Sequence, residues 1–296
     1  KNQEDERMKK RLMAAVLSTA MAATMLLTGS ISVQAADAAA ANDPAVELIF
    51  TSVSVSGDSH TEAMYEFADK VEELSGGSVT CKCYDNGSLF SSENEFDALL
   101  NGDADLAYIS FPTIATQIPS YSMFASGYLF SSYEHMTSVL NGDIGLNKIR
   151  PQIEETLNIK PLSSFYLGSR VINTREKEIN SYDDMNGLLL RMPNSEAWLF
   201  LGEALGANPT PLSFSELYTA LQTGAVDAQD NPLPSIESAK FYEVTKYIAI
   251  TNHVVDSIMP CINGDTWNSM TEAQQEAVTE AMEYARDVND TARLDR

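Results

Sequence analysis

The chain has 296 residues, of which 44% are hydrophobic and 21% are charged, and its net charge at pH 7 is −23. This length and composition suffice for a large hydrophobic core in one or two domains. The strong acidity argues against binding to a phosphate backbone or an anionic membrane surface, so we expect no nucleic acid among the partners.

The N-terminal segment has the pattern of a secretory signal peptide. Residues 8–11 are a positively charged start, residues 12–27 are an apolar stretch, and residues 33–35 resemble a cleavage site. We therefore assign residues 1–35 to the signal peptide with the residues upstream of it, and residues 36–45 to a flexible leader. A membrane anchor is the alternative, but the apolar stretch is short and interrupted by hydroxyl residues. We expect the mature protein to be exported to the periplasm or another extracytoplasmic part of the cell envelope.

The part that follows alternates between strand and helix patterns. Apolar and β-branched runs predict strands over residues 46–55, 79–84 and 106–109, and amphipathic stretches predict helices over 61–74 and 93–100. This order predicts an α/β fold with a mostly parallel, doubly wound sheet. Later patterns predict helices over 131–140, 144–157 and 236–241, strands over 160–167 and within 247–262, and a helix from residue 271 onwards.

Residues 187–234 read as a strand, a helix, a turn, a second helix and a second strand. An apolar run over residues 188–190 predicts a strand that ends at Arg191, and Asn194 is the expected N-cap of a helix starting at Ser195. Gly206 is the expected end of that helix, and Pro209 and Pro211 predict a stiff turn after it. Ser213 or Ser215 is the expected N-cap of the second helix, which would end at Gly224. A strand over residues 225–228 would follow, closed by Asn231-Pro232.

This order places Arg191 at the carboxyl end of a parallel strand, beside a helix N-terminus. Open α/β sheets bind ligands at that position. An arginine fork with free helix N–H groups can receive a carboxylate. A surface arginine held in a salt bridge is the alternative that the residues alone leave open.

Two stretches of the chain resemble each other. Residues 100–105 and 221–227 both combine a helix that ends at a glycine with a strand that starts about an aspartate. Two lobes of similar build would produce this pattern. We expect Asp105 and Asp227 to be structural residues and not ligand contacts.

The three cysteines lack the spacing of a metal or redox site. Cys81 and Cys83 alternate on a predicted strand and face the same side, which suits neither a zinc site nor a disulfide between them. We expect small buried apolar residues, with a bridge from either one to Cys261 as the alternative. The histidines are widely separated, and we find no nucleophile, phosphate-loop or dinucleotide motif, so no metal and no cofactor are expected.

Residues 187–232 closely resemble the signature block of the substrate-binding receptors of TRAP (tripartite ATP-independent periplasmic) transporters, of the DctP type. That block reads GLKLRVP…PTP..FSE.Y.ALQTG.VDGQENP, and here Met192, Ala228 and Asp230 replace its valine, glycine and glutamate. The similarity continues over residues 241–253 and, more weakly, from residue 46 onwards.

The resemblance implies a two-lobed, periplasmic-binding-protein-like (Venus flytrap) fold in which each lobe is a mostly parallel sheet flanked by helices. Lobe I would comprise residues 46–168 and 257–296, and lobe II residues 169–256, with a cleft between them. Family members usually continue beyond the equivalent of Arg296, so further C-terminal helices are implied.

The resemblance also implies the site residues. Arg191 matches the arginine that clamps the ligand carboxylate, Arg170 a second cleft arginine, and Asn231 an asparagine that hydrogen-bonds the ligand. Phe214 matches an aromatic residue under the ligand, and Ser195 follows at the helix start.

Five further residues are candidates for the cleft, with weaker support from the family resemblance. Trp198 would stack on the ligand, with a core tryptophan as the alternative. Ser110 and Thr113 stand where some sialic-acid-binding members carry charged residues, which argues against sialic acid. His60 and Glu95 are further cleft candidates, with surface positions as the alternative.

The function implied is an exported, non-enzymatic receptor that closes on a carboxylate-bearing solute. Such a solute would be a sugar acid, a dicarboxylate or a keto acid, delivered to the integral membrane permease subunits of the transporter. One alternative is an enzyme that uses the cleft, such as an acid-processing hydrolase. Another is a receptor for a ligand that lacks a carboxylate or is bound through a metal.

Overall fold

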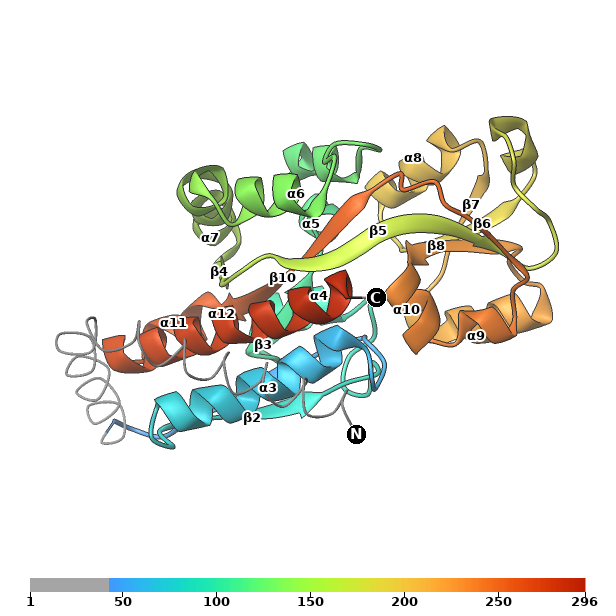
Figure 1. Ribbon diagram of the computed structural model, residues 1–296. Coiled ribbons are helices and arrows are strands. Elements are labelled where there is room, and N and C mark those ends of the chain that lie inside the picture. Colours follow the sequence, from blue (N-terminus) through green and yellow to red (C-terminus); the bar gives the residue numbers. More distant parts are fainter. Residues whose placement is uncertain (1–42, 296) are drawn as a thin grey trace, which may run out of the picture.

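The computed structural model describes residues 43–295, and the segments assigned to the signal peptide and to most of the leader lie outside them. Within the described residues, strands form a ten-stranded mixed sheet in the order β2-β1-β3-β10-β5-β8-β6-β7, with β4 paired to β10 and β9 to β5. Figure 1 shows two lobes joined by the long strands β5 and β10. No helix in this part of the chain is long and apolar enough to cross a membrane.

The elements have the following bounds. The strands are β1 (Val46–Thr51), β2 (Val79–Tyr84), β3 (Leu106–Ile109), β4 (Ile159–Pro161), β5 (Phe165–Thr174), β6 (Leu189–Met192), β7 (Asn208–Pro211), β8 (Ala228–Pro232), β9 (Tyr247–Ala249) and β10 (Val255–Asn263). The α-helices are α3 (Ser59–Leu74), α4 (Glu95–Asn101), α5 (Phe111–Ile114), α6 (Tyr133–Leu140), α7 (Arg150–Leu157), α8 (Glu196–Ala204), α9 (Phe214–Thr223), α10 (Leu233–Ser238), α11 (Gly264–Ser269) and α12 (Glu272–Leu294). Shorter turns are the 3-10 helices η1 (Pro119–Ala125), η3 (Tyr182–Met185) and η4 (Phe241–Glu243), and the π-helix η2 (Gly145–Ile149).

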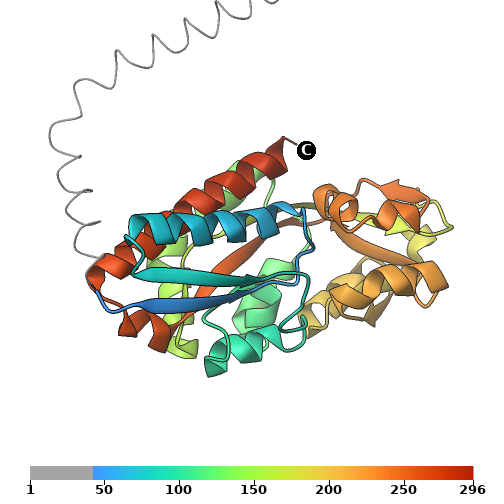
Figure 2. The same ribbon diagram turned by 90° about the horizontal axis from the view of Figure 1, so that it is seen from below.

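The first lobe is built on β1, β2 and β3, which are parallel as expected, while β10 returns antiparallel beside β3. Successive side chains of β3 serve two cores, because residues alternate across a sheet. Leu106 and Tyr108 pack with α3 and α12, and Ala107 and Ile109 pack with α4, α5 and α6. Figure 2 shows α12 lying beside α3 along the same side of this lobe.

The second lobe is built on β6, β7 and β8, which are parallel to one another, and on β5, which is antiparallel to β8. Val171 and Ile172 of β5 again point to different cores. Ile172 packs with Trp198 of α8, and Val171 packs with Leu217 of α9 and Ile236 of α10. Helices therefore cover both faces of this sheet.

Core membership changes along the two connecting strands. Phe165 belongs to a first-lobe core, whereas Val171, on the same strand, belongs to a second-lobe core. Val254 belongs to the second lobe, and Ile258 packs against the first. These changes support the lobe division near residues 168 and 256, which we propose as the hinge.

Some predicted boundaries in the central block were wrong. Ser195 caps α8 in place of Asn194, because Ser195 is extended and its hydroxyl accepts from Trp198 N. Pro209 and Pro211 lie in the edge strand β7, where a missing N–H is tolerated, and not in a turn. The second strand of the block, β8, begins at Ala228 and not at Ala225, because Ala225 N still donates to Ala220 O at the end of α9.

Other predicted boundaries shifted. The first strand stops at Thr51 and not at residue 55, residues 160–167 divide between β4 and a longer β5, and the helix expected over 236–241 is α10. The sequence expectation of a single helix over 144–157 is met by η2 followed by α7.

Asp105 and Asp227 have the structural role expected of them. Asp105 N donates to Ile49 O, and Asp105 Oδ2 accepts from Ile49 N at 2.8 Å. Asp227 repeats both bonds with Leu189, with 3.0 Å between Oδ2 and Leu189 N. Each aspartate thus ties the start of its own strand to the parallel neighbouring strand, after a left-handed glycine that ends the preceding helix.

The cysteines are free thiols. Cys81 and Cys83 both pack against the core under α3, as their alternation predicts, but each is only half-buried, so the expectation of buried side chains was wrong for this pair. They lie on β2, the edge strand of the sheet, which has a neighbour on one side only. Cys261 is fully buried.

Candidate ligand-binding cleft

A cavity lies at the junction of the two lobes, and every residue named above as substrate-binding lines it. From the first lobe these residues are Ser110 and Thr113, and from the second lobe Arg170, Arg191, Ser195, Trp198, Phe214 and Asn231.

The strand register brings the polar residues of the second lobe together. Arg170 pairs with Pro232 and Val171 with Asn231 across β5 and β8, and Arg191 pairs with Gln229 across β6 and β8. Because β6 and β8 are parallel, their carboxyl ends meet at one edge of the sheet, which is the edge that faces the first lobe. The position expected for Arg191 in an open α/β sheet is therefore confirmed.

Arg191 is a buried cation without a carboxylate partner. It is 2% exposed, its Nε donates to Leu212 O at 2.8 Å, and its guanidinium carbon lies 5.9 Å from the centre of the Phe214 ring. No carboxylate in residues 43–295 lies within 4.0 Å of its nitrogens, and none of these residues accepts from Nη1 or Nη2. Burial, together with the nearby Arg170, lowers the pKa of Arg191 to about 10, against the opposing effect of Asp230.

Arg170 is held by two carboxylates. Its Nε donates to Asp256 Oδ2 at 2.7 Å, its Nη1 donates to Asp230 O at 3.0 Å, and Nη1 lies 3.3 Å from Asp230 Oδ1. Burial would lower the pKa of Arg170, but the Asp230 and Asp256 carboxylates raise it above its ordinary value. The ring of Trp198 lies 4.2 Å below the guanidinium carbon. This arginine is positioned on three sides by the protein itself.

Trp198 is a core tryptophan, which was the alternative to stacking on the ligand. It is 2% exposed, packs in the core of the second lobe, and stacks on Arg170 at the cavity wall. Its contribution to the cavity is the orientation of a guanidinium.

His253 completes the contacts of Asp230. Its Nε2 lies 3.2 Å from Asp230 Oδ2, and its Nδ1 lies 2.7 Å from the Thr251 hydroxyl. Burial would raise the pKa of Asp230, but Arg170 and His253 lower it overall. His253, just before β10, is thus a buried hydrogen-bonding residue.

The side-chain amide of Asn231 is oriented by a chain of amides. Asn173 Nδ2 donates to Tyr247 O, so Asn173 Oδ1 is left to accept from Gln229 Nε2 at 3.2 Å. Gln229 Oε1 in turn accepts from Asn231 Nδ2 at 2.6 Å. Asn231 Oδ1 has no hydrogen-bond partner in the described chain, so it is available as an acceptor at the cavity.

The hydroxyl residues at the cavity are also helix caps. Ser195 Oγ accepts from Trp198 N, and Ser110 Oγ accepts from Thr113 N at 3.3 Å. The hydroxyls of Ser110 and Thr113 lie 2.9 Å apart in a mutual hydrogen bond. Each hydroxyl therefore has a fixed position before any ligand arrives.

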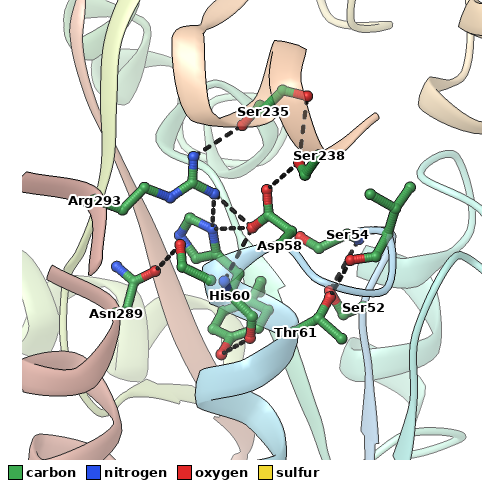
Figure 3. Close-up of polar contacts among 12 residues, drawn as sticks. Ser52, Ser54, Asp58, His60, Thr61, Ser235, Ser238, Asn289 and Arg293 are labelled. Atoms are coloured by element: carbon green, nitrogen blue, oxygen red, sulfur yellow. Dashed lines mark hydrogen bonds and ion pairs between the residues drawn. The ribbon is translucent and has the colours of Figure 1, made fainter. Parts of the chain in front are cut away.

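Sequence reasoning missed a polar cluster that closes one side of the cavity, drawn in Figure 3. Arg293, from the last turn of α12, donates through Nη2 to Asp58 Oδ1 at 2.5 Å and through Nη1 to Ser235 Oγ at 3.0 Å. Ser238 Oγ donates to Asp58 Oδ2 at 2.8 Å. Asp58 and Arg293 belong to the first lobe and the serines to α10, so the cluster bridges the lobes. Only the fold brings these distant stretches together, and no local sequence pattern marks them.

His60 is not a cleft residue, so that prediction was wrong, and its alternative as a surface residue was wrong too. It is 1% exposed and lies behind Asp58. Arg293 Nη2 lies 2.6 Å from His60 Nδ1, and because a guanidinium can only donate, Nδ1 accepts. Burial and Arg293 lower the pKa of His60 to about 4, which keeps the ring neutral at pH 7.

Comparison with known proteins decides the family. The profile of bacterial extracellular solute-binding proteins, family 7, matches residues 50–293. The chain belongs to this family. It is a substrate-binding receptor of the TRAP transporter type with the two-lobed α/β fold of its relatives, and the resemblance seen in the sequence is confirmed.

Individual relatives cover most of the chain. The sialic acid-binding periplasmic protein SiaP of Vibrio cholerae is 33% identical over 75% of this chain and 68% of its own length. A TRAP periplasmic solute-binding protein of Roseobacter denitrificans, solved with bound 3-deoxy-D-manno-oct-2-ulosonic acid, is 38% identical with a TM-score of 0.80, covering 85% of this chain and 82% of its own. The sugar acid-binding protein DctPAm of Advenella mimigardefordensis, solved with galactonate, is 28% identical with a TM-score of 0.82, covering 86% and 81%.

Proposed function

We propose that this receptor binds an organic acid in the cavity between its lobes, with Arg191 as the carboxylate clamp, and delivers it to the integral membrane permease of a TRAP transporter. The observation that carries the proposal is the state of Arg191. A buried guanidinium without a counter-charge is unfavourable. A ligand carboxylate would supply that charge through two parallel hydrogen bonds to the fork.

The other contacts suit the same kind of ligand. Asn231 Oδ1 can accept from a ligand hydroxyl, Ser195 and Ser110 offer hydroxyls, and Phe214 provides an apolar floor beside Arg191. Relatives named above were solved with sugar acids. The neutral pair Ser110 and Thr113 supports a ligand other than sialic acid.

We propose binding without chemical conversion. The nearest histidines support this, because His60 and His253 are both buried and held by other side chains. Three acidic groups beside the cavity are likewise occupied, with Asp230 and Asp256 on Arg170 and Asp58 on Arg293. We also propose that the protein acts after export, as its N-terminal pattern indicates.

A thermal-shift screen tests the proposal. Ligands that bind only the folded state raise the melting temperature by an amount that grows with the logarithm of the ligand concentration relative to Kd. We expect at least one sugar acid, dicarboxylate or keto acid to stabilise the protein strongly, and mass spectrometry to recover it unchanged. Stabilisation by neutral sugars or amines alone would contradict the carboxylate clamp, and recovery of a converted product would favour an enzyme.

A further inference from the structure

Glu95 is a buried carboxyl group at the cavity with no partner. It is the first residue of α4, it is 5% exposed, and it lines the cavity beside Ser92 and Ser110. Within residues 43–295 its side chain makes no hydrogen bond and no ion pair, and its Oε1 is fully buried.

A carboxylate in this position would be strongly disfavoured. An isolated ion loses its hydration on burial, and a carboxyl group responds by keeping its proton. Burial raises the pKa of Glu95 well above its ordinary value, and no charged neighbour contributes to that shift. A protonated Glu95 offers one O–H donor and one carbonyl acceptor.

Apart from Arg191, the charged side chains that line the same cavity already form ion pairs within the protein. Besides Glu95 and the Tyr108 phenol, the titratable or charged side chains of the lining are Asp58, Arg170, Arg191, Asp256 and Arg293. Arg170 is paired with Asp256 and Asp230, and Arg293 with Asp58. Arg191 alone among these arginines has no carboxylate within 4.0 Å in the described chain. The cavity thus has a counter-charge for one ligand carboxylate and not for two.

We propose that Glu95 carries a proton and hydrogen-bonds a neutral hydroxyl of the ligand, so that the receptor takes hydroxylated monocarboxylates in preference to dicarboxylates. This inference rests on the proposed function, since Arg191 is assumed to bind the ligand carboxylate. A hydroxyl both donates and accepts, which matches the two functions of a protonated carboxyl group. A second carboxylate in place of that hydroxyl would be desolvated without a cation.

Matched ligands test the preference. Galactonate and galactarate share a carbon chain and differ in a terminal CH2OH or carboxylate, and gluconate and glucarate form a second such pair. Titration calorimetry on the full chain should give at least tenfold tighter binding for the monocarboxylate of whichever pair binds. Equal or tighter binding of the dicarboxylate would overturn the proposed ligand class.

Two near-isosteric variants test the role of Glu95 itself. Glu95→Gln keeps a donor and an acceptor, and Glu95→Met keeps the volume without either. We expect Glu95→Met to weaken monocarboxylate binding by about five- to hundred-fold, the range for a buried hydrogen bond, and Glu95→Gln to recover part of that loss. Equal affinities of the two folded variants, checked by thermal melts, would contradict a hydrogen-bonding role.

A pH profile separates this role from a structural one. Above the pKa of Glu95 the wild-type affinity should fall by up to tenfold per pH unit, because binding then requires a proton to be taken up. Neither variant should show that fall below pH 9, while the loss near the Arg191 pKa of about 10 is common to all three proteins. An affinity that rises with pH in the wild type would mean an ionised Glu95 and would overturn the inference.

A ligand-free measurement keeps this inference separate from the proposed function. Carboxyl resonances of protein labelled with 13C-glutamate should include one that titrates far above the others and is missing in Glu95→Gln. If no probe binds the wild type, the proposed function fails, and this titration still decides the state of Glu95. An ordinary titration of Glu95 would overturn the inference whatever binds.

Discussion

The two walls of the cavity are built differently. The second-lobe wall places Arg170, Arg191 and Asn231 on paired strands, where the sheet register fixes their spacing. The first-lobe wall places Glu95 and Ser110 at the starts of short helices, with no guanidinium apart from that of Arg293 near the end of α12. We propose a division of roles: the sheet wall fixes where a negative charge can lie, and the helix-start wall offers neutral hydrogen-bonding groups around it.

The sheet wall contains a second contrast, between two buried arginines. Arg170 is paired with Asp230 and Asp256, whereas Arg191 has no carboxylate within 4.0 Å in the described chain. We therefore propose that the same residue type contributes to folding in one position and to binding in the other. Substitutions at these positions test whether the two contrasts hold.

The largest expected effect is on folding stability. Arg170→Ala leaves two buried carboxylates without their cation, which should lower the free energy of unfolding by about 3–5 kcal/mol. Arg191→Ala removes an uncompensated cation and should leave the ligand-free stability nearly unchanged or raise it. Urea denaturation of both variants measures the difference, and a larger loss for Arg191→Ala would contradict the contrast.

The order reverses for ligand affinity. Arg191→Ala should cost about 2–5 kcal/mol of binding free energy, roughly thirty-fold to several thousand-fold in Kd. Arg191→Lys should cost less but relax the choice among carboxylates, because lysine keeps the charge and loses the fork. Arg170→Ala should weaken binding less than Arg191→Ala does. Calorimetric titration with the acid found by screening checks the order, and near-native binding by Arg191→Ala would exclude the clamp.

The first-lobe side of the junction should be sensitive to acid. Because burial lowers the pKa of His60 from 6.5 to about 4, the unfolded chain binds a proton between these values that the folded chain does not. Folding stability should therefore fall as the pH drops from 6.5 towards 4, by up to about 3 kcal/mol from this group. His60→Gln lacks the titration and can still accept from Arg293. Parallel stability–pH curves for the two proteins would show that His60 does not titrate in this way.

The smallest expected effect concerns the contact between the walls. Ser238→Ala removes the hydrogen bond to Asp58 across the lobes and leaves the Arg293 bond in place, so affinity should fall by about two- to ten-fold. The loss should appear mainly as faster ligand release in stopped-flow measurements. Ser269→Ala is the matched control, since Ser269 bonds only within its own turn, to Thr266 O. A Ser238→Ala variant that matches this control would mean that the bond does not stabilise the closed arrangement.

The sequence predicted the sheet wall better than the helix-start wall. The apolar run before Arg191 and the proline after it mark a strand end locally, and the family resemblance supplied Arg170, Phe214 and Asn231. Asp58, Ser235 and Arg293 were not found, because their proximity depends on α12 lying against α3 and reaching α10, which no local periodicity encodes. The edge strand β7 was not predicted either, because its prolines indicate a turn when the neighbouring strand is not known.

With Asn231 as the ligand contact proposed above, the amide chain behind it gives one backbone atom an influence on ligand choice at a distance. The Tyr247 carbonyl can only accept a hydrogen bond, so the side-chain amide of Asn173 must turn its nitrogen towards it. This fixes the orientation of the Gln229 amide, which in turn fixes that of Asn231. The amide atom of Asn231 that does not bond Gln229 is therefore its oxygen. The polarity of the binding surface is thus inherited from a strand that lines no part of the cavity. A substitution within the relay would change whether Asn231 presents an acceptor or a donor at the cavity, while every residue that lines the cavity stays the same.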